Sequence, residues 1–185
     1  VVATESSTTA ATTRATPSAS FGVPAAATDA LGWPELPPLR LPREDPMADW
    51  LAAIGDFTLD QLAQAPGNSL GLQITVARTA MTNGDLALAS HTADAILAED
   101  PWEWRGLWIH GLVAMASNDA AAVELFNTVY GQVPGELAPK LALARACEHA
   151  GQFDVAVRMY QVCTRTDATY IAPAQFGLAR IGQLR

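Results

Sequence analysis

From about residue 45 to the end of the chain, large apolar residues recur at the three- and four-residue spacing of amphipathic helices. Short polar turns interrupt this pattern at regular intervals, and no run alternates apolar with polar residues as a half-buried strand would. The pattern therefore predicts an all-α fold. The turns with the strongest helix-ending residues are Asn83-Gly84-Asp85, Ser117-Asn118-Asp119 and Ala150-Gly151-Gln152.

Small residues repeat at fixed distances from these turns. Gly84 and Gly151 are 67 residues apart, close to two periods of the tetratricopeptide repeat, which is roughly 34 residues long. With Ser117 as the marker of the middle turn, that turn is expected to be one residue short. The repeated positions are Ala77, Gly111 and Ala144 before the turns, Ala89, Ala122 and Ala156 after them, and then the packing residues Ala93, Phe126 and Tyr160.

The period predicts a tetratricopeptide-repeat helical solenoid over residues 69–185, with about three repeats and a truncated fourth. In the last helix, Phe176 and Ala179 repeat the start of the third helix pair, and the chain ends before a partner helix. Because a solenoid unit without its second helix leaves an apolar face uncovered, we expect the native chain to continue beyond this point.

The N-terminal part has a different composition. Of the first 30 residues, 20 are Ala, Ser or Thr, and five prolines follow between residues 34 and 46. Such a segment buries too little to offset its ordering entropy, so we expect residues 1–44 to be a disordered, proline-rich linker. Its apolar residues, Trp33, Leu36, Leu39 and Leu41, are expected to hold it against a neighbouring surface, and its PxxP sequence leaves open docking into an aromatic groove of another protein.

Residues 45–68 are expected to be a helical spacer. Asp45 is a good N-cap and Pro46 suits the first helical position, which predicts a short helix over residues 46–54. Thr58 and Gln61 have the spacing of a capping box and predict the start of a second short helix.

Composition and charge exclude some classes of function. The 185 residues carry a formal net charge of −8 and one lysine, which excludes a typical nucleic-acid binder with a basic face. No apolar run is long enough to span a membrane and no signal pattern opens the chain, so a cytoplasmic location is expected. Cys147 and Cys163 do not form a CxxC pair and are expected to be buried, reduced thiols.

The repeats predict a protein-binding groove, because the first helix of each pair lines the concave face of such a solenoid. An apolar row one turn from arginines suits an extended or helical peptide that carries carboxylates or phosphates. The alternative is that the arginines pair with acids on neighbouring helices and that the apolar row is buried between repeats. The candidate groove residues are Ile74, Arg78, Trp108, Leu112, Leu141, Arg145, Phe176 and Arg180.

The charges also suggest self-association. Residues 85–124 carry seven acidic residues and one arginine, a net charge of −6, whereas residues 137–185 carry six basic and three acidic residues, a net charge of +3. Opposite poles can steer two copies together. Solvated faces without a partner are the alternative.

Catalytic and metal-binding motifs are not found in the sequence. The three histidines are dispersed, and there is no Walker A, HExxH or GxSxG motif. We therefore expect no catalytic residue, no metal site and no cofactor in this chain.

Two stretches carry a more specific resemblance. The run Pro134-Gly-Glu-Leu-Ala-Pro-Lys-Leu-Ala-Leu-Ala144 and the tryptophans of Trp102-Glu-Trp104-Arg105 resemble the C-terminal tetratricopeptide region of the actinobacterial serine/threonine protein kinase G (PknG) family. Upstream, Leu41-Pro-Arg-Glu-Asp45-Pro46 and Leu59-Asp-Gln-Leu62 are similar to that family's spacer between kinase domain and repeats.

The resemblance implies a non-catalytic interaction and regulatory segment that recruits substrate or self-associates beside a kinase domain. In that family a rubredoxin-like metal motif and a kinase domain precede this region, and the substrate is a forkhead-associated-domain protein. This chain has no Gly-rich loop, HRD or DFG motif, so no catalytic role carries over. A tetratricopeptide scaffold with no attached kinase is the alternative.

Overall fold

The computed structural model describes residues 32–39, 41–42, 44–53, 56–165 and 167–184. Helices, and no strands, make up the regular structure of these ranges, which confirms the all-α class. A 3-10 turn η1 (Trp33–Glu35) and two short helices, α1 (Ala48–Ala53) and α2 (Leu59–Leu62), precede the long helices. The long helices are α3 (Leu70–Thr82), α4 (Leu86–Glu99), α5 (Trp104–Ala116), α6 (Ala121–Gln132), α7 (Leu137–His149), α8 (Phe153–Cys163) and α9 (Ala168–Leu184).

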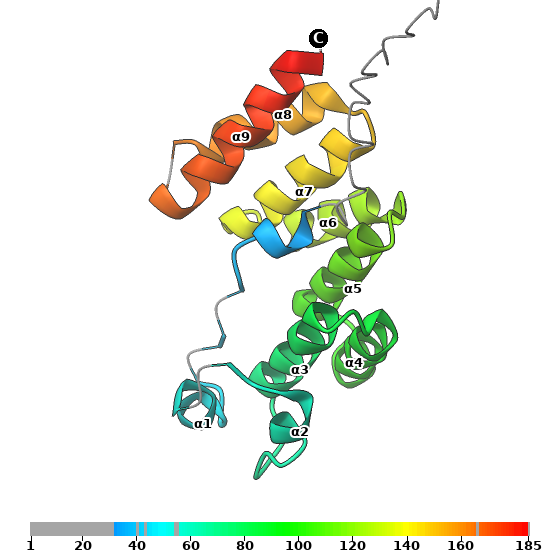
Figure 1. Cartoon of the computed structure of the whole chain (residues 1–185), viewed down its shortest axis with the longest axis vertical. Helices are drawn as coiled ribbons and strands as arrows, with labels where there is room; N and C mark the ends of the chain where they lie inside the picture. The colour runs from blue at the N-terminus through cyan, green and yellow to red at the C-terminus, as the bar shows by residue number, and fades with distance from the viewer. Residues whose placement is uncertain (1–31, 40, 43, 54–55, 166, 185) are drawn as a thin grey trace, which may run out of the picture.

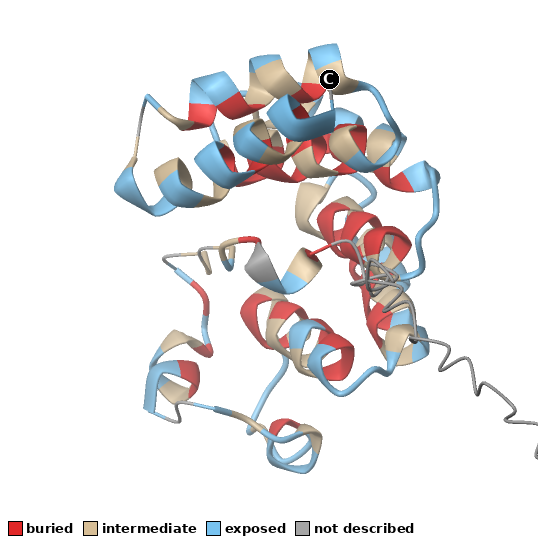
Figure 2. Ribbon diagram, turned by 45° about the horizontal axis from the view of Figure 1, so that its top comes forward, coloured by how far each residue is buried: buried red, intermediate tan, exposed pale blue. Residues whose placement is uncertain are grey.

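The long helices stack as pairs. α3 packs on α4, α5 on α6 and α7 on α8, and each pair also packs on the next (Figure 1). α9 packs on α8 and α7 as the first helix of a further unit. The buried residues lie between the helices along the whole stack (Figure 2). This arrangement confirms the expected helical solenoid of about three repeats and a partial fourth.

All three hairpin turns have the same geometry. Gly84, Asn118 and Gly151 adopt the left-handed conformation, with φ of 80°, 59° and 73°. In each turn the N–H of the next residue donates to a carbonyl five residues earlier, and the three N···O distances are all 2.8 Å. This is the Schellman motif, which ends a helix by satisfying its last carbonyls.

The shared geometry corrects the register of the middle turn. Its left-handed residue is Asn118, not Ser117, so Gly111 lies seven residues before it, as Ala77 does before Gly84. The missing residue falls after the turn instead, because Ala122 follows Asn118 by four positions where the other repeats have five. Asparagine tolerates the left-handed region better than most residues, which explains why a search for glycine misplaced the turn.

The small residues of the repeat lie where helices approach most closely. Ala77, Ala89, Ala144 and Ala156 are fully buried. At Gly111, a Cβ atom would lie only 2.6 Å from the ring of Phe126, so the glycine is needed for α5 to approach α6. The packing residues expected on the second helices, Ala93, Phe126 and Tyr160, are also fully buried.

The spacer differs from expectation at its first helix. α1 begins at Ala48, and Pro46 lies in the turn before it. Asp45 accepts a hydrogen bond from the Met47 N–H at 2.8 Å and from the Gly71 N–H, in the first turn of α3, at 2.6 Å. Burial raises the pKa of Asp45, but hydrogen bonds from Ser69, Gly71 and Met47 outweigh it and leave the pKa below the usual value. The capping box of Thr58 and Gln61 at α2 is confirmed.

The expectation of disorder over residues 1–44 is corrected for the described residues 32–39 and 41–42, which we call the strap. The strap packs on the repeats, and its Leu36 is only 6% exposed within the main hydrophobic core. Trp33, Leu39 and Leu41 are partly buried against the same core. These four apolar residues supply the burial that the Ala/Ser/Thr-rich stretch lacks. Residues 1–31 lie outside the described part of the chain.

Candidate protein-binding groove

Four of the eight candidate groove residues line one pocket. Ile74 and Arg78 of α3 and Trp108 and Leu112 of α5 border a cavity of about 600 Å³, a size typical of ligand sites. The strap forms the facing wall. The cavity is lined by Trp33, Leu36, Pro37, Pro38, Leu39, Leu41, Asp56, Phe57, Ile74, Thr75, Arg78, Thr79, Met81, Thr82, Asn83, Trp108, Ile109 and Leu112.

The apolar members of the predicted row differ in exposure. Ile74, Trp108, Leu112 and Leu141 are buried, as the alternative of packing between repeats requires, although three of them still reach the pocket wall. Phe176 is 66% exposed on α9. The predicted apolar row therefore does not form one continuous exposed surface.

Two charged residues line this pocket, Arg78 and Asp56, and Arg78 is the basic one. No carboxylate of the described residues forms a salt bridge with it, and desolvation lowers its pKa from the ordinary value. A guanidinium remains ionised at neutral pH even so. A cation in partly apolar surroundings favours an anionic group, which it can bind through two parallel N–H donors.

Arg145 and Arg180 follow the alternative reading, since both bind an acid. The Glu148 carboxylate accepts bonds from Arg180 Nε at 2.7 Å and Arg180 Nη2 at 2.9 Å, and Arg145 Nη1 lies 3.4 Å from it. The Tyr160 hydroxyl donates to Glu148 Oε2 at 2.6 Å. Burial and the Glu148 carboxylate raise the pKa of Tyr160, so its hydroxyl remains a donor.

The Glu148 cluster ties three helices together. Glu148 and Arg145 belong to α7, Tyr160 to α8 and Arg180 to α9. Sequence reasoning did not single out Glu148. The signal was available, because Arg145 precedes it by three residues, a spacing that brings side chains together on a helix.

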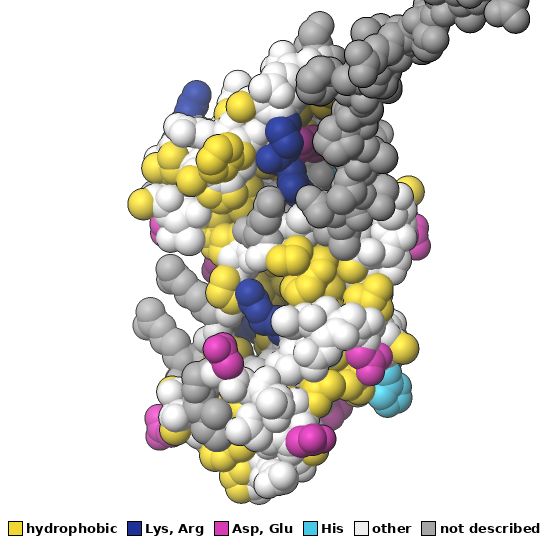
Figure 3. Space-filling model, in the orientation of Figure 1, with side chains coloured by type: hydrophobic (Ala, Val, Ile, Leu, Met, Phe, Trp, Pro, Cys, Tyr) yellow, Lys and Arg dark blue, Asp and Glu magenta, His cyan; other side chains and the backbone are white. Residues whose placement is uncertain are grey.

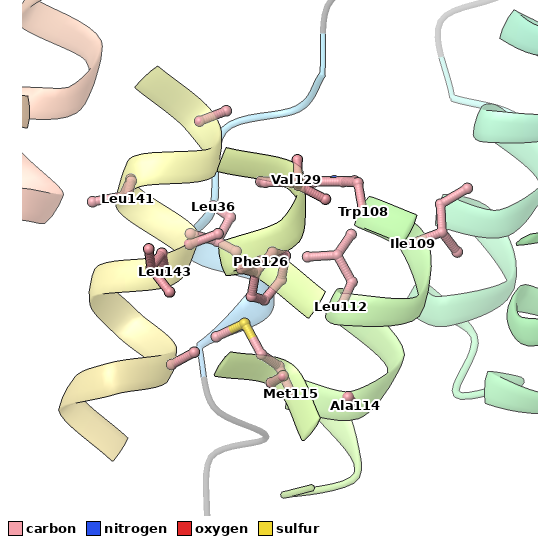
Figure 4. Packing of buried hydrophobic residues seen from close by; sticks show 14 of the residues in the cluster. Leu36, Trp108, Ile109, Leu112, Ala114, Met115, Phe126, Val129, Leu141 and Leu143 are labelled. Carbon is pink, nitrogen blue, oxygen red and sulfur yellow. The ribbon is translucent and has the colours of Figure 1, made fainter. Parts of the chain in front are cut away.

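Sequence reasoning also missed that the groove is partly filled by the strap. Gly32, at φ 61°, lies so close to Arg145 that a Cβ atom there would meet the guanidinium. Leu36 belongs to the cluster that contains Trp108, Phe126 and Leu141 (Figure 4). The strap therefore covers the part of the face that Leu141 and Arg145 were expected to offer to a partner.

A family model described as "Protein kinase G tetratricopeptide repeat" matches residues 8–184. The chain belongs to this family. It is 36% identical over 133 residues to the serine/threonine-protein kinase PknG of Mycolicibacterium smegmatis (strain ATCC 700084 / mc(2)155), and 32% identical over 133 residues to that of Mycobacterium leprae (strain TN).

The PknG resemblance inferred from the sequence is thereby confirmed. Each alignment covers 71% of this chain and 17% of the relative. The chain thus spans about a sixth of the length of these curated kinases, and the catalytic activity in their names is a property of much longer proteins.

In this member of the PknG family, the strap also borders a second pocket of about 680 Å³. Pro37, Pro38, Leu39 and Leu41 line both pockets, so the strap separates them. Arg105 lines the second pocket. It pairs with Glu103 at 2.8 Å and stacks on Trp104, and its buried Nε atom finds no hydrogen-bond partner among the described residues. Each pocket thus offers an arginine beside the proline-rich strap.

The two cysteines are buried thiols, as predicted. Burial raises the pKa of Cys147, and it raises the pKa of Cys163 to about 11 although the Lys140 charge acts in the opposite direction. Because the thiolate is the reactive form, neither thiol is activated at neutral pH. Among the described residues, no group of three His, Cys, Asp or Glu side chains is arranged to hold a metal ion. None of the helices described is long and apolar enough to cross a membrane.

Proposed function

We propose that this chain is the non-catalytic protein-interaction segment of a PknG-like serine/threonine kinase and acts in the cytoplasm. Family membership supports the kinase context, and tetratricopeptide repeats commonly bind other proteins. The interaction we favour is recruitment of an acidic or phosphorylated protein segment to the pocket between α3, α5 and the strap. A forkhead-associated-domain protein is the partner class that we expect.

One observation carries this proposal. Arg78 combines a partly desolvated positive charge with an apolar cavity and has no described ion-pair partner. Arg145 and Arg180 offer no such combination, because Glu148 already binds both. Basic side chains lie beside hydrophobic ones on the face shown in Figure 3. An acidic segment with an apolar neighbour would satisfy both parts of the pocket.

Replacing Arg78 with alanine should weaken binding of a forkhead-associated-domain protein by roughly tenfold or more, because a hydrogen bond to a charged group contributes roughly 1.5–3 kcal/mol. The salt dependence of binding should also decrease, since one screened charge is lost. Calorimetric titrations at two salt concentrations measure both effects.

The matched control for this experiment is Arg158→Ala, which removes the same charge from the exposed side of α8. Its affinity should stay within about twofold of the wild type. Equal losses in the two variants would show that net charge, and not the pocket, drives binding. An unchanged affinity in Arg78→Ala would remove the pocket from recruitment. Trp108→Ala is a poor probe, because Trp108 is a buried core residue.

Self-association is a second candidate function, favoured by an exposed apolar surface at the C-terminal end. Phe176 and Leu184 are each 66% exposed, and Val162 on α8 is 41% exposed. They lie in the half of the sequence with net positive charge, whereas residues 85–124 are net negative. A second copy could cover the apolar residues while the opposite charges attract.

Phe176→Ser should shift the chain toward monomer in sedimentation equilibrium if two copies meet through α9. High salt should shift the wild type in the same direction, because the attraction between opposite poles is screened. Trp102→Ser is the control, since Trp102 is 80% exposed at a different place, the turn before α5. A wild type that is monomeric at all concentrations would exclude this function for the chain.

A further inference from the structure

The strap has the properties of a bound peptide. It lies across the repeats in Figure 1, and its Leu36 inserts into the core cluster between α5 and α7 (Figure 4). Among the described residues, no backbone–backbone hydrogen bond joins the strap to the long helices. Its apolar side chains are buried against the repeats, as those of an extended ligand are in a groove.

The backbone of the strap matches one mode of peptide recognition. Leu36 has φ −72° and ψ 133°, close to the polyproline II conformation, and Pro37 and Pro38 follow it. Proline-rich segments bind grooves lined with aromatic residues, because their backbone is already extended and loses little entropy on binding. Trp108 and Phe57 supply aromatic rings to the wall that faces the strap.

The surroundings of the strap show where a longer ligand would run. It is bordered by a pocket on each side, and each pocket contains an arginine, Arg78 in one and Arg105 in the other. The strap therefore borders two pockets and fills neither. A segment that took the place of the strap and also reached into either pocket would make contacts that the strap does not.

We propose that the strap is an intramolecular ligand of this groove, and that the groove binds proline-rich partner segments with the strap's own chemistry, leucine followed by two prolines and a second leucine. Such a segment must displace the strap before it can bind. Only molecules whose strap is undocked can bind such a segment. The apparent affinity of the groove is therefore its intrinsic affinity multiplied by the fraction of molecules with an undocked strap. This proposal concerns the same groove as the proposed function but needs no acidic partner, so either can fail alone.

The test uses the full chain and a synthetic peptide with the sequence of residues 32–41, Gly-Trp-Pro-Glu-Leu-Pro-Pro-Leu-Arg-Leu. Leu36→Asp in the chain places a carboxylate at a buried position and should release the strap. This variant should bind the peptide at least tenfold more tightly than the wild type does, as measured by fluorescence anisotropy of a labelled peptide.

Two controls make the result specific. Trp102→Asp introduces the same carboxylate at an apolar residue that is 80% exposed and is not among the residues that line the two pockets, and it should leave the peptide affinity at the wild-type value. A peptide with aspartate in place of Leu36 should lose its binding to every form of the chain. Both results are expected if the leucine pocket in the groove recognises the strap.

Three results would overturn the proposal. The first is equal peptide affinity in the wild type and Leu36→Asp, and the second is no binding to either. The third is loss of helical circular dichroism in both Leu36→Asp and the milder Leu36→Ala, because a displaceable ligand can leave without unfolding the repeats. That result would make Leu36 a residue of the folding core.

Discussion

Glu148→Ala should lower the free energy of unfolding by about 2–3 kcal/mol. Breaking a buried ion pair by removing one partner typically costs about 3–5 kcal/mol, because the remaining charge is left without compensation. The Glu148 side chain is only 11% exposed, but that of Arg180 is 37% exposed, so water can partly replace the lost carboxylate. An acid in the last turn of α7 also opposes the helix dipole, which reduces the loss by a few tenths of a kcal/mol.

Chemical denaturation followed by circular dichroism measures this change. Glu124→Ala is the matched control, because Glu124 is exposed on α6, and its unfolding free energy should stay within about 0.5 kcal/mol of the wild type. Tyr160→Phe removes only the hydroxyl that bonds Glu148 and should cost about 1 kcal/mol. If Glu148→Ala and Glu124→Ala unfold at the same denaturant concentration, the Glu148 cluster does not hold α9 against α7 and α8.

Ala156→Leu should destabilise the third repeat by about 1–3 kcal/mol, the usual range for forcing extra methylenes into a packed core. Ala156 has no exposed surface and lies on α8, which packs against α7. The equivalent alanine of the first repeat, Ala89, is equally buried. Leucine at either position would push apart two helices that the repeat brings into close contact.

Thermal and denaturant unfolding compare this variant with Ala179→Leu, in which the same side chain is added at an exposed position of α9. Leucine has nearly the helix propensity of alanine, so the control should unfold within about 0.5 kcal/mol of the wild type. If Ala156→Leu unfolds with the same denaturant midpoint and slope as the wild type, the contact between α7 and α8 can accommodate a leucine. A small side chain is then not required at this position.

The repeat architecture could be predicted because its determinants are local. A helix that ends in a left-handed turn needs a residue that tolerates positive φ, and a close contact between two helices needs a small side chain. Both requirements therefore appear in the sequence as particular residue types at fixed positions of the repeat. Gly84 and Gly151 satisfy the first need and Ala77 and Ala144 the second. The one misplaced turn occurred where Asn118 replaces glycine, so the local mark was weaker.

The candidate site was predicted less completely, because its determinants are not local. The sequence placed Arg78, Arg145 and Arg180 at equivalent positions, but only the packing of α9 on α7 shows that two of them bind one carboxylate. The position of the strap depends on the whole face that it covers. Its four apolar residues indicated that it would contact some surface, and nothing in their spacing specified which one.

The carboxylate of Asp45 acts as a clamp at the joint between spacer and solenoid. One oxygen holds the Met47 N–H before α1 and the other holds the Gly71 N–H at the start of α3. Because the pKa of Asp45 is below its usual value, this carboxylate stays ionised at neutral and mildly acidic pH. Rotation of the spacer about the first repeat would break the hydrogen bond between Asp45 and Gly71, so the connection at this point is stiff. A force on the chain at Asp45 is therefore transmitted to the N-terminus of α3.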